Sequence, residues 1–188
     1  MNFRGSSGYG HDFMSAGLGN WGLAMQDDVE DGTRWMIEQG YSDPNKICIV
    51  GASYGGYAAL MGTVKSPDLY KCAVSFAGVT DVAYLVKSSR RYTNFDVVKK
   101  QIGSNYKDLS RRSPIKHADK INVPVLLIHG TKDRSVRVQH SKRMHKALQK
   151  AGKDVNYIEL ENGTHFLDNN DNRVRTFKEM EAFLAQYL

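Results

Sequence analysis

The sequence has 188 residues, of which 41% are apolar and 24% are charged, with seventeen glycines and only four prolines. This length and composition fit one globular domain over residues 1–188, and they exclude a disordered or fibrous chain. No apolar run approaches the roughly 18 residues of a membrane-spanning helix, and the N-terminus has no apolar segment typical of a signal peptide.

The formal net charge of +6 is unevenly placed: lysine and arginine predominate in residues 87–153, and acidic residues predominate on either side. A basic segment can bind nucleic acid, but this one lacks regularly interleaved aromatic residues. We therefore expect neither a nucleic-acid nor a membrane partner. Cys48 and Cys72, the two cysteines, are too few for a disulfide framework, so we expect both to be buried, free and inert. Without a secretion signal, a cytoplasmic location is expected.

In chain order, the pattern alternates helical segments with short apolar runs. Predicted helices cover residues 26–39, 135–150 and 172–187, the second beginning at a capping Ser135 and the third carrying an apolar stripe from Val174 and Phe177 to Tyr187. Predicted strands are Ile47–Val50, Cys72–Phe76, Val123–His129 and Val155–Leu160. Their nearly continuous apolar character is typical of a parallel sheet buried on both faces. The sequence thus predicts an α/β fold with helices on both faces of the sheet, and residues 86–120 are expected to form a polar helical excursion over the sheet's top edge.

The segment Gly51-Ala52-Ser53-Tyr54-Gly55 has the pattern Gly-x-Ser-x-Gly between a predicted strand and a predicted helix. The glycines permit the tight turn that lifts a serine hydroxyl above a sheet, so Ser53 is predicted to be a nucleophile. The helix that follows begins at this serine, and the Tyr54 amide is therefore the predicted donor to an oxyanion.

A nucleophilic serine needs a base and an acid that orients the base. Among six histidines, His165 follows the last predicted strand, where catalytic groups collect in parallel sheets. His140 and His145 are expected to face solvent on a helix, and His129, at the end of a buried strand, is expected to be structural. Asp133 and Asp81 both follow strands and are both candidates for the acid. The chain order Ser53, Asp133, His165 is that of α/β-hydrolase triads, which favours Asp133.

These motifs make the chain similar to the catalytic domain of prolyl oligopeptidase-family serine peptidases, particularly acylaminoacyl-peptidase and dipeptidyl-peptidase-like members. The matching segments are Asn2–Gly10, Gly19–Gly22, Asp27-Asp28, Gly51–Gly56, Ser113-Pro114 and Pro124–Asp133. The resemblance implies an α/β-hydrolase-type fold and the catalytic roles already given to Ser53, Asp133 and His165. In similar enzymes the excursion supplies aromatic residues to the substrate pocket, here Tyr84, Tyr92 and Phe95. The alternative is that these three only pack the excursion onto the sheet.

The sequence departs from the family pattern in two ways. Phe166 stands where a glycine usually follows the catalytic histidine. The resemblance also implies strands, a His-Gly-Gly-type loop, an oxyanion-hole tyrosine and a β-propeller upstream of the matched part. We expect this chain to lack them, so that the sheet is truncated at its N-terminal side and the Ile47–Val50 strand has an open edge. We expect that the open edge is covered in a homo-oligomer, or that the chain is a piece of a longer protein.

The sequence therefore predicts a serine hydrolase, a peptidase or carboxylesterase, that acts on small esters or short peptides without a metal or cofactor. The alternative is a weak or inactive module that functions through self-association or a partner chain.

Overall fold

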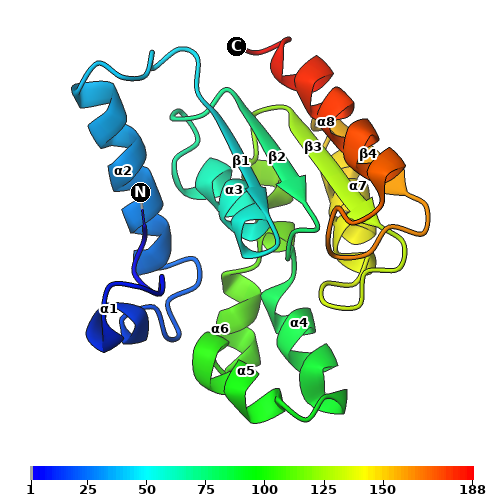
Figure 1. Ribbon diagram of the computed structural model, residues 1–188. Helices are drawn as coiled ribbons and strands as arrows, with labels where there is room; N and C mark the ends of the chain where they lie inside the picture. Colours follow the sequence, from blue (N-terminus) through cyan, green and yellow to red (C-terminus); the bar gives the residue numbers. More distant parts are fainter. Residues whose placement is uncertain (1) are drawn as a thin grey trace.

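The computed structural model describes residues 2–188, and in this part of the chain the sheet has four strands, all parallel. They are β1 (Cys48–Ala52), β2 (Cys72–Phe76), β3 (Val125–Gly130) and β4 (Val155–Leu160), and they lie in this order across the sheet (Figure 1). The predicted α/β fold is confirmed. Because the strands are parallel, their carboxyl ends share one edge, and the loops that follow β1, β3 and β4 meet there.

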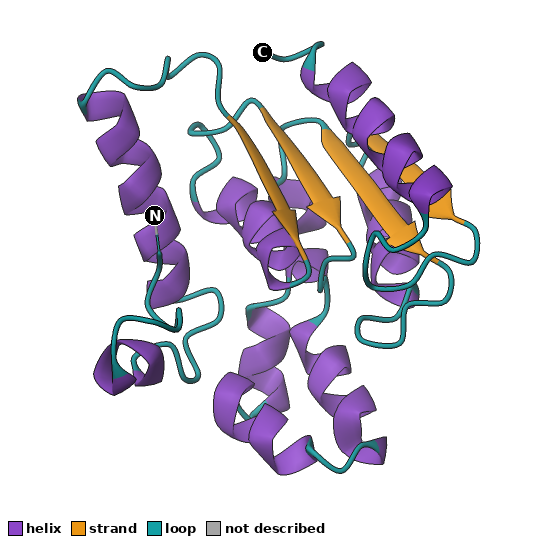
Figure 2. Ribbon diagram, in the orientation of Figure 1, coloured by secondary structure: helices purple, strands orange, loops and turns teal. Residues whose placement is uncertain are grey.

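Helices lie on both sides of the sheet (Figure 2). Their bounds are α1 (His11–Ser15), α2 (Ala24–Glu38), α3 (Tyr54–Lys65), α4 (Val82–Ser88), α5 (Phe95–Ile102), α6 (Tyr106–Arg111), α7 (Gln139–Lys150) and α8 (Asn170–Leu184), with 3-10 turns η1 (Ser89–Arg91) and η2 (Pro114–Lys120). Figure 1 shows α3 and α7 behind the sheet and α8 in front of it, while α4, α5 and α6 lie beyond the carboxyl ends of the strands. The polar region 86–120 is thus mostly helical.

One apolar cluster packs on each face of the sheet, and a third packs α3 against α4, α5 and α6. Successive strand residues point to opposite faces, so Leu127 packs toward α3 and α7, where it meets Leu60 and Met144. Its neighbour Ile128 packs on the other face with Phe183 of α8. This burial on both faces explains why β2 and β3 are apolar apart from Ser75 and His129.

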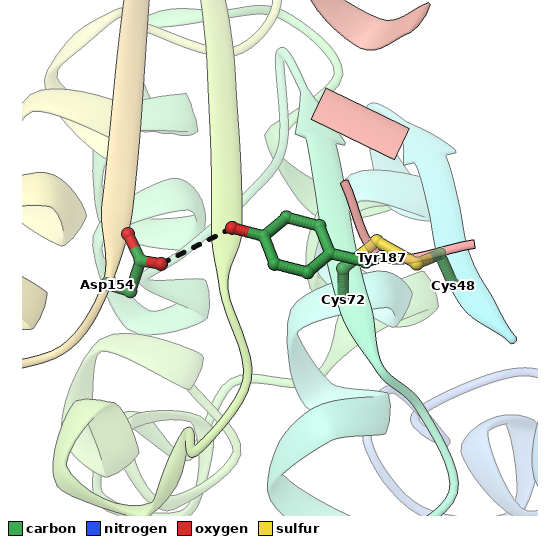
Figure 3. The surroundings of a disulfide bond; sticks show 4 residues. All are labelled: Cys48, Cys72, Asp154 and Tyr187. Carbon is green, nitrogen blue, oxygen red and sulfur yellow. Dashed lines mark hydrogen bonds between the residues drawn. A yellow bond between two sulfur atoms is a disulfide. The ribbon is translucent and has the colours of Figure 1, made fainter. Parts of the chain in front are cut away.

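The prediction of free cysteines was wrong. Cys48 and Cys72 are register partners on neighbouring strands, with Cα atoms 4.6 Å apart, and a disulfide joins them. Figure 3 shows this bond with Tyr187, whose hydroxyl donates a hydrogen bond to Asp154. Disulfides persist mainly in oxidising compartments, so the expected cytoplasmic location loses the support that free thiols would have given it.

The sequence also misplaced parts of two helices. α7 begins at Gln139 rather than at a capping Ser135, because residues 133–136 form a turn closed by the Asp133 carboxylate. His140, expected to face solvent, is buried at 1% exposure. On α8, Phe183 is buried, whereas Val174 and Phe177 of the predicted stripe are exposed.

β1 lies at the edge of the described sheet and pairs only with β2. Val50 is 46% exposed, and an open apolar groove of about 410 Å³ separates β1 from α2, with Ile47, Ile49 and Met36 among its lining residues. An open apolar strand edge is a surface for pairing with another chain. The expected homo-oligomer stays a prediction. No helix within residues 2–188 is long and apolar enough to cross a membrane.

Candidate active site

Ser53 occupies the sharp turn between β1 and α3. Its backbone has φ 57° and ψ −117°, a conformation that costs energy for a residue with a Cβ atom. Two hydrogen bonds hold it in place: its N–H donates to the carbonyl of Phe76 at the end of β2, and its own carbonyl accepts from Tyr57 N–H in α3. The strained turn presents the hydroxyl at the carboxyl edge of the sheet, as in a nucleophile elbow.

Glycines are required around this turn because backbones approach one another closely. A Cβ on Gly51 would lie 2.1 Å from the carbonyl oxygen of Gly55. A Cβ on Gly56 would lie 2.8 Å from both the Cα of Gly78 and the hydroxyl of Ser75. Gly51 and Gly56 are therefore required by packing at the β1–α3 junction and at its contact with the loop after β2, whereas a Cβ on Gly55 would meet no atom within 4 Å.

A second close approach joins the loops after β3 and β4. A Cβ on Gly130 would lie 2.3 Å from the carbonyl oxygen of Gly163, so these two glycines allow the loops to touch. Lys132 N–H donates to the same Gly163 carbonyl, and Asn162 N–H donates to the hydroxyl of Thr131. These contacts bring Asp133 and His165, which are 32 residues apart, to one point on the sheet edge.

The three predicted triad residues form a continuous hydrogen-bonded chain. His165 Nε2 lies 3.0 Å from Ser53 Oγ, and His165 Nδ1 lies 2.7 Å from Asp133 Oδ2. The Asp133 side chain is fully buried, and that of His165 is 14% exposed. With Nδ1–H donating to the carboxylate, Nε2 is left to accept the serine proton, which is the arrangement that general-base activation of a hydroxyl requires.

Asp133 is held ionised by its surroundings. Burial alone would raise its pKa, but hydrogen bonds outweigh it and the pKa lies well below the ordinary value. His165 and His129 face Oδ2, the latter with Nε2 3.3 Å away, and the backbone N–H groups of Ser135 and Val136 donate to Oδ1 at 2.8 Å each. An ionised, fully engaged carboxylate fixes the orientation of the His165 ring.

The contact of His129 with Asp133 was missed at the sequence level, where His129 was interpreted as structural. It is fully buried, and its other ring nitrogen, Nδ1, lies 2.8 Å from Ser141 Oγ. The motif His129-Gly130-Thr131-Lys132-Asp133 could have signalled this, since the turn after β3 returns position 133 to the strand end.

The competing acid, Asp81, lies apart from the His165–Asp133 pair. Its carboxylate accepts from Tyr84 N–H, which caps α4, and pairs with Arg143 at 3.0 Å. Its backbone N–H faces His140 rather than His165. Asp81 is thus engaged in holding α4 to α7.

The Tyr54 amide is at the first position of α3, where a backbone N–H has no partner within the helix. The Tyr54 ring packs against the rings of Phe3 and Trp21, with centroids 5.3 and 4.6 Å away. Residues near the N-terminus therefore pack against the residue that follows Ser53. Its hydroxyl is buried without a hydrogen-bond partner in residues 2–188, and burial raises its pKa.

The structure separates the three aromatic residues predicted to bind substrate. Tyr92 lines an open groove of about 690 Å³ together with Leu85, Arg134 and Ser135. Arg134 and Ser135 are the two residues that follow Asp133 in the chain. Phe95 is half-buried against the apolar cluster of the excursion. Tyr84 lies in a different groove, beside Arg143.

His140 gives the fold a dependence on pH. Its Nδ1 faces the backbone N–H groups of Thr80 and Asp81 at 3.2 and 3.3 Å, so the native state requires a neutral ring. Burial lowers the pKa of His140 to about 4. The unfolded chain binds this proton near pH 6.5, so stability from this residue is complete above pH 6.5 and is lost as the pH falls toward 4.

We expect the free energy of unfolding to fall by up to about 3 kcal/mol across this window through His140 alone. Urea denaturation at pH 7, 5.5 and 4.5 measures it. His140→Gln should have a shallower pH dependence than the wild type. His145→Gln, a change on the same helix but at a half-buried position, is the control and should keep the wild-type slope. An unchanged slope in His140→Gln contradicts the assignment.

Comparison with known proteins shows the family of the chain. The sequence matches the prolyl oligopeptidase family over residues 1–188. It is 34% identical to dipeptidyl aminopeptidase BIII of Pseudoxanthomonas mexicana, over all of this chain and 28% of that protein. The fold superposes with a TM-score of 0.92 on a puromycin-hydrolyzing peptidase of Mycobacterium tuberculosis and 0.91 on the acylaminoacyl peptidase of Pyrococcus horikoshii, each 27% identical.

Each structural match covers all of this chain but only 29% and 31% of those proteins, respectively. The chain therefore spans less than a third of the length of these relatives. Its matched part includes the Ser53 turn, the Asp133 loop and the His165 loop. The chain belongs to the prolyl oligopeptidase family of serine peptidases.

Proposed function

We propose that the chain is a serine hydrolase that cleaves peptide amide bonds, and small activated esters, through an acyl-enzyme. The observation that carries this proposal is the hydrogen-bonded chain Ser53–His165–Asp133 on a strained strand-to-helix turn. Relatives named as dipeptidyl aminopeptidase and acylaminoacyl peptidase support short peptides as the substrate class.

In the proposed reaction, Ser53 Oγ attacks the scissile carbonyl carbon while His165 Nε2 takes the hydroxyl proton. Asp133 holds the ring and stabilises the imidazolium that forms. The C–N or C–O bond then breaks, the leaving group takes the proton from His165, and an acyl-serine remains. Water, deprotonated by His165, attacks the acyl-serine and releases the acid, returning the proton to Ser53.

Tyr54 N–H is the proposed donor to the tetrahedral oxyanion. Removing one of two such donors costs on the order of 10²–10³ in rate, so a chain that uses Tyr54 N–H alone would react slowly. We propose that the groove lined by Tyr92, Leu85 and Arg134 holds the acyl or peptide portion of the substrate, since Arg134 directly follows Asp133 in the chain. Phe95 supports the wall of the excursion, and Tyr84 is assigned no direct contact with substrate.

The alternative function, a weak or inactive module that pairs with another chain, is favoured by one observation: the open edge of β1 with exposed Val50. The two functions differ in their chemistry. A competent site forms a covalent adduct with a reagent that mimics the tetrahedral intermediate, and an inactive one does not.

We expect a fluorophosphonate probe to label the chain once, with the adduct on the peptide that contains Ser53. Mass spectrometry of the intact chain and of its tryptic peptides locates the adduct. Ser53→Ala should remain unlabelled, while Ser104→Ala, a change at an exposed serine, should be labelled like the wild type. A folded wild-type sample that takes up no probe would favour the inactive module.

A further inference from the structure

A second groove, of about 530 Å³, lies on the other side of α4 from the Tyr92 groove. Residues 84 and 87 of α4 face it, whereas residues 85 and 88 face the Tyr92 groove, so the short helix separates the two. Four cationic side chains line this basic groove, and they are contributed by four elements: Lys87 of α4, Arg90 of η1, Lys116 of η2 and Arg143 of α7.

Two of these cations are laid over aromatic rings that line the same groove. The Arg90 guanidinium lies 5.5 Å from the centroid of Tyr106, and the Arg143 guanidinium lies 5.2 Å from the centroid of Tyr84. Stacking on a ring restricts a long side chain and leaves the N–H donors at the edge of the guanidinium available. The groove therefore presents one partly preorganised fork of donors from Arg90, and from Arg143 the donors that do not pair with Asp81.

The positive charge of the basic groove is poorly compensated. Asp81 is the only carboxylate among its lining residues in the described chain, and it is engaged by Arg143 and by the amide of Tyr84. Within residues 2–188, Lys87, Arg90 and Lys116 form no ion pair. Three uncompensated cations around a concavity raise the local concentration of anions.

The size and donor chemistry of the groove indicate what it would bind. A volume of about 530 Å³ lies within the range of small-molecule sites. Guanidinium forks match the geometry of phosphate oxygens, and ammonium groups add point charges. We propose that the basic groove binds a small ligand that carries two or more phosphoryl charges. This binding is independent of the proposed hydrolysis at Ser53.

Inorganic pyrophosphate is the probe, titrated into the 188-residue chain by calorimetry at low salt and pH 7.5. We expect one site, and an affinity that falls as sodium chloride is added. The double variant Lys87→Gln/Arg90→Gln, at two exposed positions, should weaken binding about tenfold or more, because it removes two of the three cations that have no ion pair in the described chain. Lys116→Gln, on η2, should weaken it by a smaller factor.

The matched control is Lys150→Gln/Lys178→Gln, which removes the same charge from exposed positions on α7 and α8. Its affinity should stay within about twofold of the wild type. Equal weakening by the control pair would show a response to net charge alone and would overturn the proposal. Absence of pyrophosphate binding, or tighter binding of the tricarboxylate citrate, would overturn it as well.

Discussion

Ser53→Ala is expected to lower kcat on a chromogenic ester or peptide by about four to six orders of magnitude, and His165→Ala should do the same. Ser53 Oγ and His165 Nε2 are 3.0 Å apart and act on one proton, so either change removes the same step. The double variant Ser53→Ala/His165→Ala should therefore be no slower than either single variant. This non-additivity separates a cooperating pair from two residues that support the fold independently.

The measurement is steady-state kinetics on each purified variant, with circular dichroism to confirm folding. Ser104→Ala and His145→Ala are the matched controls, since neither residue belongs to the site, and each should retain kcat within a few-fold. If the losses of the two single variants multiplied in the double variant, the two residues would not share a proton-transfer step, and the proposed mechanism would be wrong.

Asp133→Asn should lower kcat by about 10⁴ near pH 7. Asparagine preserves the shape of the side chain but replaces the carboxylate that accepts from His165 Nδ1–H at 2.7 Å. The ring then loses both the preferred tautomer and the charge that stabilises imidazolium. Asp81→Asn is the matched control: Asp81 was the competing acid in the sequence, and it pairs with Arg143 instead, so its variant should keep kcat within a few-fold. A larger loss in Asp81→Asn would reverse the assignment.

Asp133→Asn also has a predictable effect on the stability of the fold. The native pKa of Asp133 lies below its value in the unfolded chain, so this carboxylate stabilises the fold above about pH 4, and that contribution is lost as the pH falls further. Asp133→Asn should therefore be less stable than the wild type at pH 7, and the difference should narrow in acid. Urea denaturation at pH 7 and pH 2.5 measures it, and a difference that does not narrow contradicts the sign.

Some errors of the sequence interpretation come from contacts between segments far apart in the chain. Cys48 and Cys72 looked like ordinary apolar strand residues, because nothing local indicates that β1 and β2 pair in a register that places them side by side. His140 looked like a solvent-facing residue of a polar helix. Only the packing of α7 against the loop after β2 supplies the backbone N–H groups of Thr80 and Asp81 that it faces.

Errors at helix boundaries have a different cause. Ser135 is a good capping residue by type, yet Asp133 Oδ1 takes the amides of Ser135 and Val136 and closes a turn before α7 begins. Asp133, whose carboxylate closes this turn, is also the residue that contacts His165. The start of α7 was therefore decided by the site and not by helix propensity.

The parallel α/β sheet, the strand-to-helix turn at Ser53 and the chain order of Ser53, Asp133 and His165 could all be predicted from the amino-acid sequence. These follow from local patterns: continuous apolar runs, glycines where backbones touch, and polar residues just after strands. The tertiary structure decided what those patterns leave open, namely that Asp133 rather than Asp81 meets His165, that His129 contacts Asp133, and that the two cysteines are paired. The cysteine pair depends on the register of β1 and β2, and the contact of Asp133 with His165 depends on the close approach of Gly130 to Gly163; local propensity encodes neither.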